Sequence, residues 1–193
     1  MTRLAVLVSG TGSILESLLQ QDVPVALVLA DRPCRGLDVA RQAGVPTTLV
    51  DRREFGYKGP GVTWDRTGFT TAVVTALREH GVGLAAMAGF MTILDKSIFE
   101  VFPQNILNTH PSLLPAFKGD NAVQDALDAG VKVTGCTIHY ATADLDGGPI
   151  IVQREVEVLP GDTRETLHER IKKTEREIYP EVLKKLIQKE KYA

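Results

Sequence analysis

The stretch Leu4-Ala5-Val6-Leu7-Val8-Ser9-Gly10-Thr11-Gly12-Ser13 joins a short apolar run to a Gly-rich turn near the start of the chain. An apolar run of this length, without alternating polar residues, is typical of a parallel strand that is buried on both faces. The residues that follow, 13–20, fit a helix. The stretch therefore predicts a strand that passes through a tight turn into a helix.

The same alternation of strand and helix continues along the chain. Further apolar runs occupy residues 25–30, 47–50, 84–88 and 106–108, and helical patterns occupy residues 37–43, 68–80 and 96–102. Strands that alternate with helices are connected by right-handed crossovers in α/β proteins. We therefore predict an α/β fold with a doubly wound, mostly parallel, Rossmann-like sheet.

The C-terminal part has a different pattern. Residues 133–140 and 149–158 are rich in β-forming residues, and 153–158 alternate polar and apolar side chains, as in an antiparallel or edge strand. Asp162 is a plausible N-cap of a final helix, in which Pro180 predicts a kink or restart and 184–191 a frayed, solvated end. We expect an antiparallel β extension and a terminal helix.

Length and composition limit the possible classes of protein. The 193 residues predict one domain, 1–193, with a Rossmann-like part (1–105) and a catalytic part (106–193). The net charge of −2 provides no global basic field for nucleic acid, although a local basic pocket for a small anion remains compatible. No apolar segment is long enough for a membrane span. We expect a cytoplasmic protein, either a monomer or a homodimer, with no membrane partner.

Asn108-Thr109-His110-Pro111-Ser112 places an amide and an imidazole two residues apart at the end of an apolar run. Alternate residues of an extended chain point the same way, and Pro111 favours an extended His110. An amide donor beside a titratable ring suits stabilisation of a developing oxyanion. A strand end with two solvated polar residues is the alternative. We expect Ser112 to cap a turn rather than act as a nucleophile.

The turn at Ser9-Gly10-Thr11-Gly12-Ser13 lies where a strand meets a helix, and backbone amides at a helix start favour a phosphate. A dinucleotide motif would carry Gly or Ala where Leu15 stands, and no P-loop lysine follows. A nicotinamide cofactor or nucleoside triphosphate is therefore disfavoured. A phosphorylated small substrate and a purely conformational need for glycine remain equally open.

A second group of polar residues lies at Cys136, His139, Asp144 and Asp146. A carboxylate from the Asp144-Leu145-Asp146-Gly147-Gly148 loop would favour the imidazolium of His110 and raise its pKa. Carboxylates in Gly-rich turns are also commonly structural, and His139 fits a packed strand residue equally well. Cys136 and His139 are three apart on a strand and face opposite sides, so we predict no metal site.

Four motifs stand out in order along the chain. They are Ser9-Gly10-x-Gly12-Ser13, Ala88-Gly89-Phe90-Met91-x-Ile93-Leu94, Asn108-x-His110-Pro111-Ser112-Leu113-Leu114-Pro115 and Asp144-Leu145-Asp146-Gly147-Gly148-Pro149-Ile150. Together they resemble the folate-dependent formyltransferases, and among these the members that formylate glycinamide ribonucleotide. The resemblance extends from Leu4 to Pro180. Relatives that act on tRNA or hydrolyse the donor carry extra domains, which the length of this chain leads us not to expect.

The resemblance implies two substrates, glycinamide ribonucleotide and 10-formyltetrahydrofolate, that meet at the carboxyl ends of the central strands. Asn108, His110 and Asp146 would be catalytic. The residues implied to hold the ribonucleotide are Gly12, Ser13, Ile14, Leu15, Glu16 and Glu175. Those implied to hold the folate are Arg66, Met91, Thr92, Ile93, Leu94, Asn108, Thr142, Ala143, Asp144, Leu145 and Asp146.

Two positions depart from the family pattern in the phosphate loop. Ile14 stands where relatives commonly carry Asn, and Thr11 where Asn or Arg is frequent, so phosphate binding would rest on backbone amides. Three other functions remain compatible with the motifs. They are a sugar-nucleotide or other amine formyltransferase, a deformylase-like hydrolase, and a non-catalytic Rossmann-like nucleotide sensor supported only by the Ser9–Ser13 turn.

Overall fold

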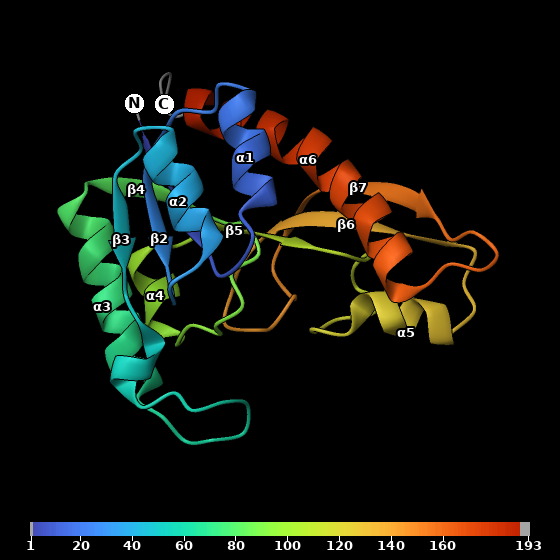
Figure 1. Ribbon diagram of the computed structural model, residues 1–193, viewed down its shortest axis with the longest axis horizontal. Coiled ribbons are helices and arrows are strands. Elements are labelled where there is room, and N and C mark those ends of the chain that lie inside the picture. The colour runs from blue at the N-terminus through green and yellow to red at the C-terminus, as the bar shows by residue number, and fades with distance from the viewer. Residues whose placement is uncertain (1, 190–193) are drawn as a thin grey trace.

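A single seven-stranded sheet runs through the computed structural model, which describes residues 2–189 (Figure 1). The strand order is β3-β2-β1-β4-β5-β6-β7; β1 to β5 are parallel, β6 pairs antiparallel with β5, and β7 pairs antiparallel with β6. The strands are β1 (Arg3–Val8), β2 (Val25–Ala30), β3 (Thr47–Leu49), β4 (Val82–Met87), β5 (Ile106–His110), β6 (Val133–Tyr140) and β7 (Ile150–Glu157).

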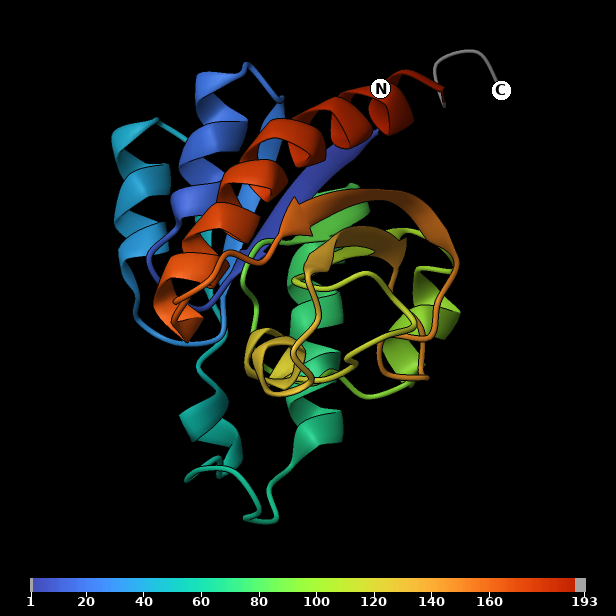
Figure 2. The same ribbon diagram turned by 90° about the vertical axis from the view of Figure 1, so that its right-hand side faces the viewer.

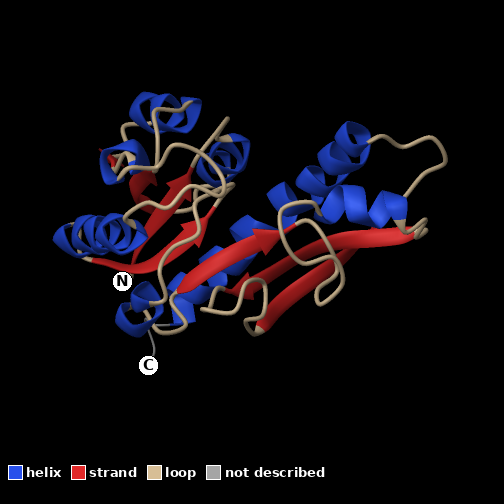
Figure 3. Ribbon diagram, turned by 90° about the horizontal axis from the view of Figure 1, so that it is seen from below, coloured by secondary structure: helices blue, strands red, loops and turns tan. Residues whose placement is uncertain are grey.

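Helices cover both faces of the sheet (Figure 3). They are α1 (Ser13–Gln20), α2 (Arg35–Gln42), the 3-10 helix η1 (Arg52–Phe55), α3 (Arg66–Glu79), α4 (Ser97–Val101), α5 (Ala122–Asp128) and α6 (Arg164–Lys189). This architecture confirms the predicted doubly wound sheet with an antiparallel extension and a terminal helix. Because the same sheet runs through residues 1–105 and 106–193, we propose that both parts form one domain.

Each parallel strand contributes side chains to two hydrophobic cores in alternation. In β1, Leu4, Val6 and Val8 belong to the core beneath α1, α2 and α6. Ala5 and Leu7 belong to the core beneath α3 and α4. Successive side chains of a strand point to opposite faces, so a strand covered on both sides must be apolar throughout. This explains why the N-terminal strands show no polar alternation.

The terminal helix departs from its prediction. It runs unbroken from Arg164 to Lys189 with Pro180 inside it, so of the predicted kink or restart the restart is wrong. The predicted fraying is also wrong over residues 184–189, because this segment is helical and Ile187 is 3% exposed, whereas Lys185 and Gln188 are exposed to solvent. Residues 190 and 191 lie outside the described residues. Burial of Tyr179, Leu183 and Ile187 on one stripe of the helix offsets the amide that Pro180 removes.

The terminal helix α6 packs against the first helix, α1. Figure 2 shows α6 (red) running alongside α1 (blue). The hydroxyl of Ser17 donates to the backbone oxygen of Arg176 at 2.9 Å, and the Gln21 amide donates to the same oxygen at 2.9 Å. The first and the terminal helix therefore pack side by side on one face of the sheet.

Candidate active site

The carboxyl end of β5 presents polar side chains to both faces of the sheet. Asn108 and His110 point to the face opposite α6, as their two-residue spacing predicts, whereas Thr109 points towards α6. The antiparallel neighbour β6 places His139 directly opposite Asn108. Opposed residues of an antiparallel pair share a face. His139 therefore joins the predicted site, although the sequence fitted a packed strand residue equally well.

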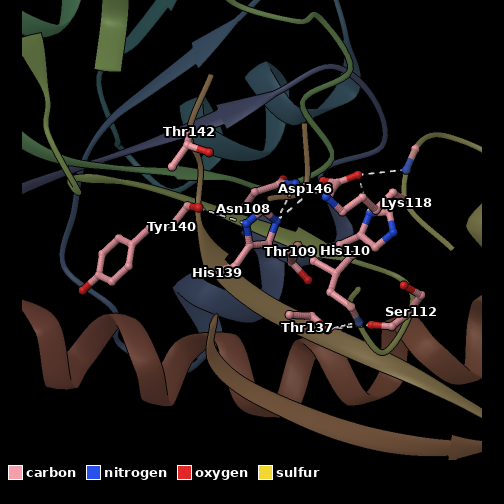
Figure 4. Close-up of polar contacts among 12 residues, drawn as sticks. Asn108, Thr109, His110, Ser112, Lys118, Thr137, His139, Tyr140, Thr142 and Asp146 are labelled. Atoms are coloured by element: carbon pink, nitrogen blue, oxygen red, sulfur yellow. Dashed lines mark hydrogen bonds and ion pairs between the residues drawn. The ribbon is translucent and has the colours of Figure 1, made fainter. Parts of the chain in front are cut away.

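Asp146 lies between two imidazole rings (Figure 4). Its Oδ2 atom is 3.4 Å from Nδ1 of His110, and its Oδ1 atom is 3.6 Å from Nε2 of His139. Nδ2 of Asn108 is 3.4 Å from that same Nε2 atom. The structure thus brings the three predicted catalytic residues together, with His139 as a fourth member.

Two loops fix the position of the Asp146 carboxylate. The residue has φ 51°, a left-handed conformation that Asp tolerates better than most residues. The backbone amide of Gly119 donates to Asp146 Oδ2 at 2.9 Å. Lys118 and Asp144 form a second, exposed link between the same loops at 3.6 Å. The loop after β5 and the loop after β6 therefore hold the carboxylate against His110.

His110 is almost fully buried beneath the segment that follows it, with 4% of its surface exposed. Its Nε2 atom lies 2.7 Å from the backbone oxygen of Phe117. A carbonyl oxygen accepts only, so Nε2 carries a proton. The hydroxyl of Ser112 donates to the backbone oxygen of Ala116 at 2.6 Å, which matches the predicted turn-capping role. For Nε2 of His110 to donate to a ligand, the ligand must displace the backbone oxygen of Phe117.

Burial lowers the pKa of His139, and this effect outweighs the opposing influences of the Tyr140 backbone contact and the Asp146 carboxylate. Nδ1 of His139 lies 3.0 Å from the backbone oxygen of Tyr140 and therefore carries the proton of the neutral ring. Nε2 is then an acceptor that faces the amide nitrogen of Asn108. This contact orients the Asn108 side chain and leaves its second N–H free for a ligand.

A buried polar cluster lies behind the site, on the α6 face of β5. Thr109 donates its hydroxyl to Oε1 of Glu175 at 2.7 Å, and Glu175 is 4% exposed. Burial raises the pKa of Glu175 to about 7. It also raises the pKa of the Cys136 thiol to about 12. Glu175 and His110 occupy opposite faces of the sheet, so Glu175 is not part of the cluster around Asp146.

The Gly-rich turn links β1 to α1. Gly12 adopts φ 75° as the N-cap of α1, and the first-turn amides of Ser13, Ile14 and Leu15 have no acceptor within the helix. The side chains of Ile14 and Leu15 are buried in the core, so these residues offer only backbone groups. The amide of Glu16 donates to the Gly12 oxygen at 2.8 Å, and its carboxylate pairs with Arg35.

The residues predicted to bind folate divide into exposed and buried groups. Met91 and Ile93 are 61% and 54% exposed, and Leu145 is 53% exposed. Thr92 and Leu94 are buried, with 6% of each residue exposed. Thr142, Ala143 and Asp144 lie on the surface of the Asp146 loop. The exposed apolar side chains suit the flat ring system of a folate.

Arg66 lies at the start of α3 and is exposed. Its guanidinium lies 6.0 Å from the ring centroid of Trp64, at the outer limit of a cation–π contact. Trp64 packs edge-on against Tyr57, and Arg52 lies over Tyr57 at 4.0 Å. Arg66 is thus connected to the Met91–Leu94 segment through these side chains rather than by direct contact.

Neither a metal site nor a membrane span is found in the part of the chain that the structure describes. Among residues 2–189, no three His, Cys, Asp or Glu side chains are grouped so that they could hold a metal ion. Cys136 and His139 lie on opposite faces of β6, as their spacing predicts. No helix within these residues is long and apolar enough to cross a membrane.

The Rossmann-like sheet carries a cluster of Asn, His and Asp side chains beside the carboxyl end of β5. A family profile described as "Formyl transferase" matches residues 2–183. The chain belongs to this family.

Named relatives within the family narrow the comparison. Phosphoribosylglycinamide formyltransferase of Mycobacterium tuberculosis is 46% identical over 91% of this chain and 80% of its own length. The Bacillus subtilis enzyme of the same name is 36% identical over 97% and 95%. The bovine trifunctional purine biosynthetic protein adenosine-3 is 42% identical, but the chain spans only 18% of its length.

Solved structures of the same class share the fold over nearly the whole chain. The Streptococcus pneumoniae phosphoribosylglycinamide formyltransferase superposes with a TM-score of 0.87 at 34% identity, covering 97% of this chain and 99% of that one. Glycinamide ribonucleotide transformylase 1 of Symbiobacterium toebii gives a TM-score of 0.86 at 43% identity, covering 95% and 86%. These comparisons confirm the fold class and the family expected from the motifs.

Proposed function

We propose that this chain transfers the formyl group of 10-formyltetrahydrofolate to the free amine of glycinamide ribonucleotide, a step of purine biosynthesis. The products are formylglycinamide ribonucleotide and tetrahydrofolate. The observation that carries the proposal is the contact of Asp146 with His110 beside Asn108, at the carboxyl edge of the sheet. Ligands of open α/β sheets bind at this edge. The names of the relatives supply the choice of acceptor.

The oxyanion site consists of Asn108 and His110. As the substrate amine attacks the formyl carbon, negative charge develops on the formyl oxygen. The free N–H of Asn108 and the Nε2–H of His110 donate to that oxygen, which takes the place of the Phe117 backbone oxygen. Each well-placed donor contributes on the order of 2–4 kcal/mol to the transition state. The amine is a competent nucleophile, so no covalent enzyme intermediate is required.

Asp146 transfers a proton from the attacking amine to the folate nitrogen. The attacking amine becomes cationic when its C–N bond forms, and it must lose a proton as the folate nitrogen leaves with one. Oδ1 and Oδ2 of Asp146 face two rings and one backbone amide, so its carboxylate is held ready to accept and return a proton. Asp146 also orients His110, because the ring lies between two acceptors.

Two further surfaces position the substrates. The amides of Ser13, Ile14 and Leu15 at the start of α1 support binding of the ribonucleotide phosphate. Met91, Ile93 and the Asp146 loop support binding of the folate ring, and Arg66 supports binding of its acidic end. Glu175 lies on the α6 face of β5. Its proposed contact with the ribose or the glycinamide therefore requires these groups to reach past the carboxyl end of β5.

A transfer assay tests the reaction. Purified protein is mixed with 10-formyltetrahydrofolate and glycinamide ribonucleotide, and the folate product is followed by absorbance. We expect product to form only when both substrates are present. Formate release without the amine would identify a hydrolase instead. Turnover with a sugar-nucleotide amine in place of glycinamide ribonucleotide would identify a different acceptor class, and no turnover with any amine would leave only a binding function.

A further inference from the structure

Residues 89–94, which lie between β4 and α4 (Figure 1), alternate between exposed and buried positions. The side chains of Met91 and Ile93 are exposed. The buried residues are Phe90, Thr92 and Leu94. This alternation is that of an extended chain with one face on the core. The segment is not one of the seven strands, so contacts other than a sheet ladder set which of its side chains face inward.

Thr92 is the polar residue on the inward side of this segment. Its hydroxyl donates to Oδ2 of Asp31, a fully buried residue that follows β2. The same hydroxyl accepts from Nη1 of Arg52 at 2.9 Å, and that nitrogen lies 3.3 Å from Oδ2 of Asp31. A hydroxyl donates once and also accepts, so both capacities of Thr92 are used. Because a buried carboxylate that loses a partner is costly, this network holds Thr92 inward.

Ser9 supplies a second anchor from the end of β1. Its Oγ atom accepts from the backbone amide of Met91 at 2.8 Å, and its own amide donates to the Gly89 oxygen at 3.2 Å. Ser9 is 6% exposed. The segment is therefore held at two consecutive residues, through the backbone of Met91 and through the side chain of Thr92.

The two anchors determine which apolar side chains meet solvent. A shift of an extended chain by one residue exchanges its two faces. Met91 and Ile93 would then enter the core and gain hydrophobic burial, which by itself is favourable. Thr92 would leave Asp31 in exchange. The polar anchors thus keep two large apolar side chains exposed, where they are available to a flat apolar ligand.

We propose that the hydroxyls of Ser9 and Thr92 are positioning groups for the folate ring, because they fix the register that turns Met91 and Ile93 outward. This inference rests on the proposed function, which places the ring on those two side chains. The hydroxyls act through the segment rather than by contact with the ring. Ser9 also belongs to the turn proposed for the ribonucleotide phosphate, so it links the surfaces of the two substrates.

Steady-state kinetics test the positioning role. In Thr92→Val, which keeps the shape but removes the hydroxyl, the KM for 10-formyltetrahydrofolate should rise about fivefold to twentyfold. The KM for glycinamide ribonucleotide and kcat should stay within about twofold. Ser9→Ala should show the same split, although Ser9 lies in the ribonucleotide turn. Thr92→Ser retains the hydroxyl and should restore the donor KM to within about threefold of the unaltered value.

Thr75→Val is the matched control. It removes a hydroxyl that donates to the Thr71 backbone oxygen on the exposed side of α3, and both KM values should stay unchanged. Calorimetric titration with tetrahydrofolate, the product, measures the effect without turnover. Its Kd should rise in Thr92→Val and Ser9→Ala as the donor KM does, with circular dichroism showing a folded chain.

An unchanged donor KM and an unchanged Kd for tetrahydrofolate in the folded variants overturn the proposal. An equal rise in the KM values of both substrates also overturns it, because that result marks a general structural role. If Thr92→Val does not fold, Ser9→Ala decides by the same criteria.

The two assays separate this inference from the proposed function. Absence of turnover by the unaltered protein contradicts the formyl transfer, whereas calorimetry with tetrahydrofolate still decides the role of the two hydroxyls. If the unaltered protein binds no tetrahydrofolate, both the proposed donor and the positioning role are overturned.

Discussion

Oδ2 of Asp146 lies 3.4 Å from Nδ1 of His110, on the side of the ring away from the Nε2 contact with the Phe117 backbone oxygen. Both neighbours of the ring are acceptors, so a proton on each nitrogen satisfies both contacts. The arrangement makes His110 a donor held in a single orientation. It also places the Asp146 carboxylate beside the proposed oxyanion site.

Asp146→Asn should lower kcat by roughly 100-fold or more, because the amide neither accepts a proton nor holds His110 as an anion does. Asn can still accept the Gly119 amide and tolerates φ 51°, so folding should persist. Steady-state kinetics with circular dichroism check both points. Asp125→Asn, on the exposed surface of α5, is the control. Equal kcat in the two variants would argue for a structural Asp146.

His139 should make stability depend on pH in the acid range. Its folded pKa is lowered by burial, so the unfolded chain takes up the proton first as the pH falls. Its contribution is present above pH 6.5, the ordinary value, and is lost as the pH falls towards the folded pKa. Urea unfolding of His139→Gln between pH 7.5 and 5 should show a smaller loss of stability than the unaltered protein. A steeper loss in the variant contradicts the assignment.

Glu175 should make stability depend on pH in the opposite direction, with stability lost as the pH rises. Burial raises its pKa from 4.5 to about 7, so the fold favours the protonated acid. Its contribution is full below pH 4.5 and is lost as the pH rises through 7. Between pH 5 and pH 8 the unaltered protein should lose about 2–3 kcal/mol relative to Glu175→Gln, at about 1.4 kcal/mol per unit of pKa shift.

Urea unfolding of both proteins at the two pH values measures this difference. Glutamine can still accept the Thr109 hydroxyl, so the comparison isolates ionisation from the loss of a hydrogen bond. A constant difference between pH 5 and pH 8 would mean that Glu175 is ionised throughout.

Gly12 and Gly10 offer a matched pair within one turn. A Cβ on Gly12 would lie 2.8 Å from the Gly36 Cα atom and would impose a left-handed Ala at φ 75°, whereas a Cβ on Gly10 meets nothing within 4 Å. Gly12→Ala should lose about 1–2 kcal/mol from backbone conformation alone, and more from the clash. It should also raise the KM for glycinamide ribonucleotide. Similar effects from Gly10→Ala would show that neither the left-handed backbone of Gly12 nor its contact with Gly36 explains the loss.

The sequence predicts strands better than helix ends. Buried parallel strands are visible as apolar runs, and the register of Asn108 and His110 follows from their spacing and from Pro111. The path of α6 through Pro180 was not predictable, because it depends on packing of Tyr179 and Leu183 against distant elements. The short helices η1 and α5 were missed, since neither carries a long periodic pattern.

The residues of the site were likewise only partly predictable from the sequence. Motif order identified Asn108, His110 and Asp146, but His139 entered the site only through its pairing with Asn108 across two strands. An antiparallel register between β5 and β6 would have predicted that pairing. The contact between Phe117 and His110 has no signal in the sequence, because a backbone oxygen makes it.

The measurement that tests the central claim most directly is the rate of formyl transfer to glycinamide ribonucleotide in His110→Ala beside the unaltered protein. Loss of an oxyanion donor should lower kcat by roughly 100- to 1,000-fold, while thermal unfolding still shows a cooperative transition. Turnover by a folded His110→Ala at the unaltered rate would contradict the account, because the donor held between Asp146 and Phe117 would then take no part in the reaction.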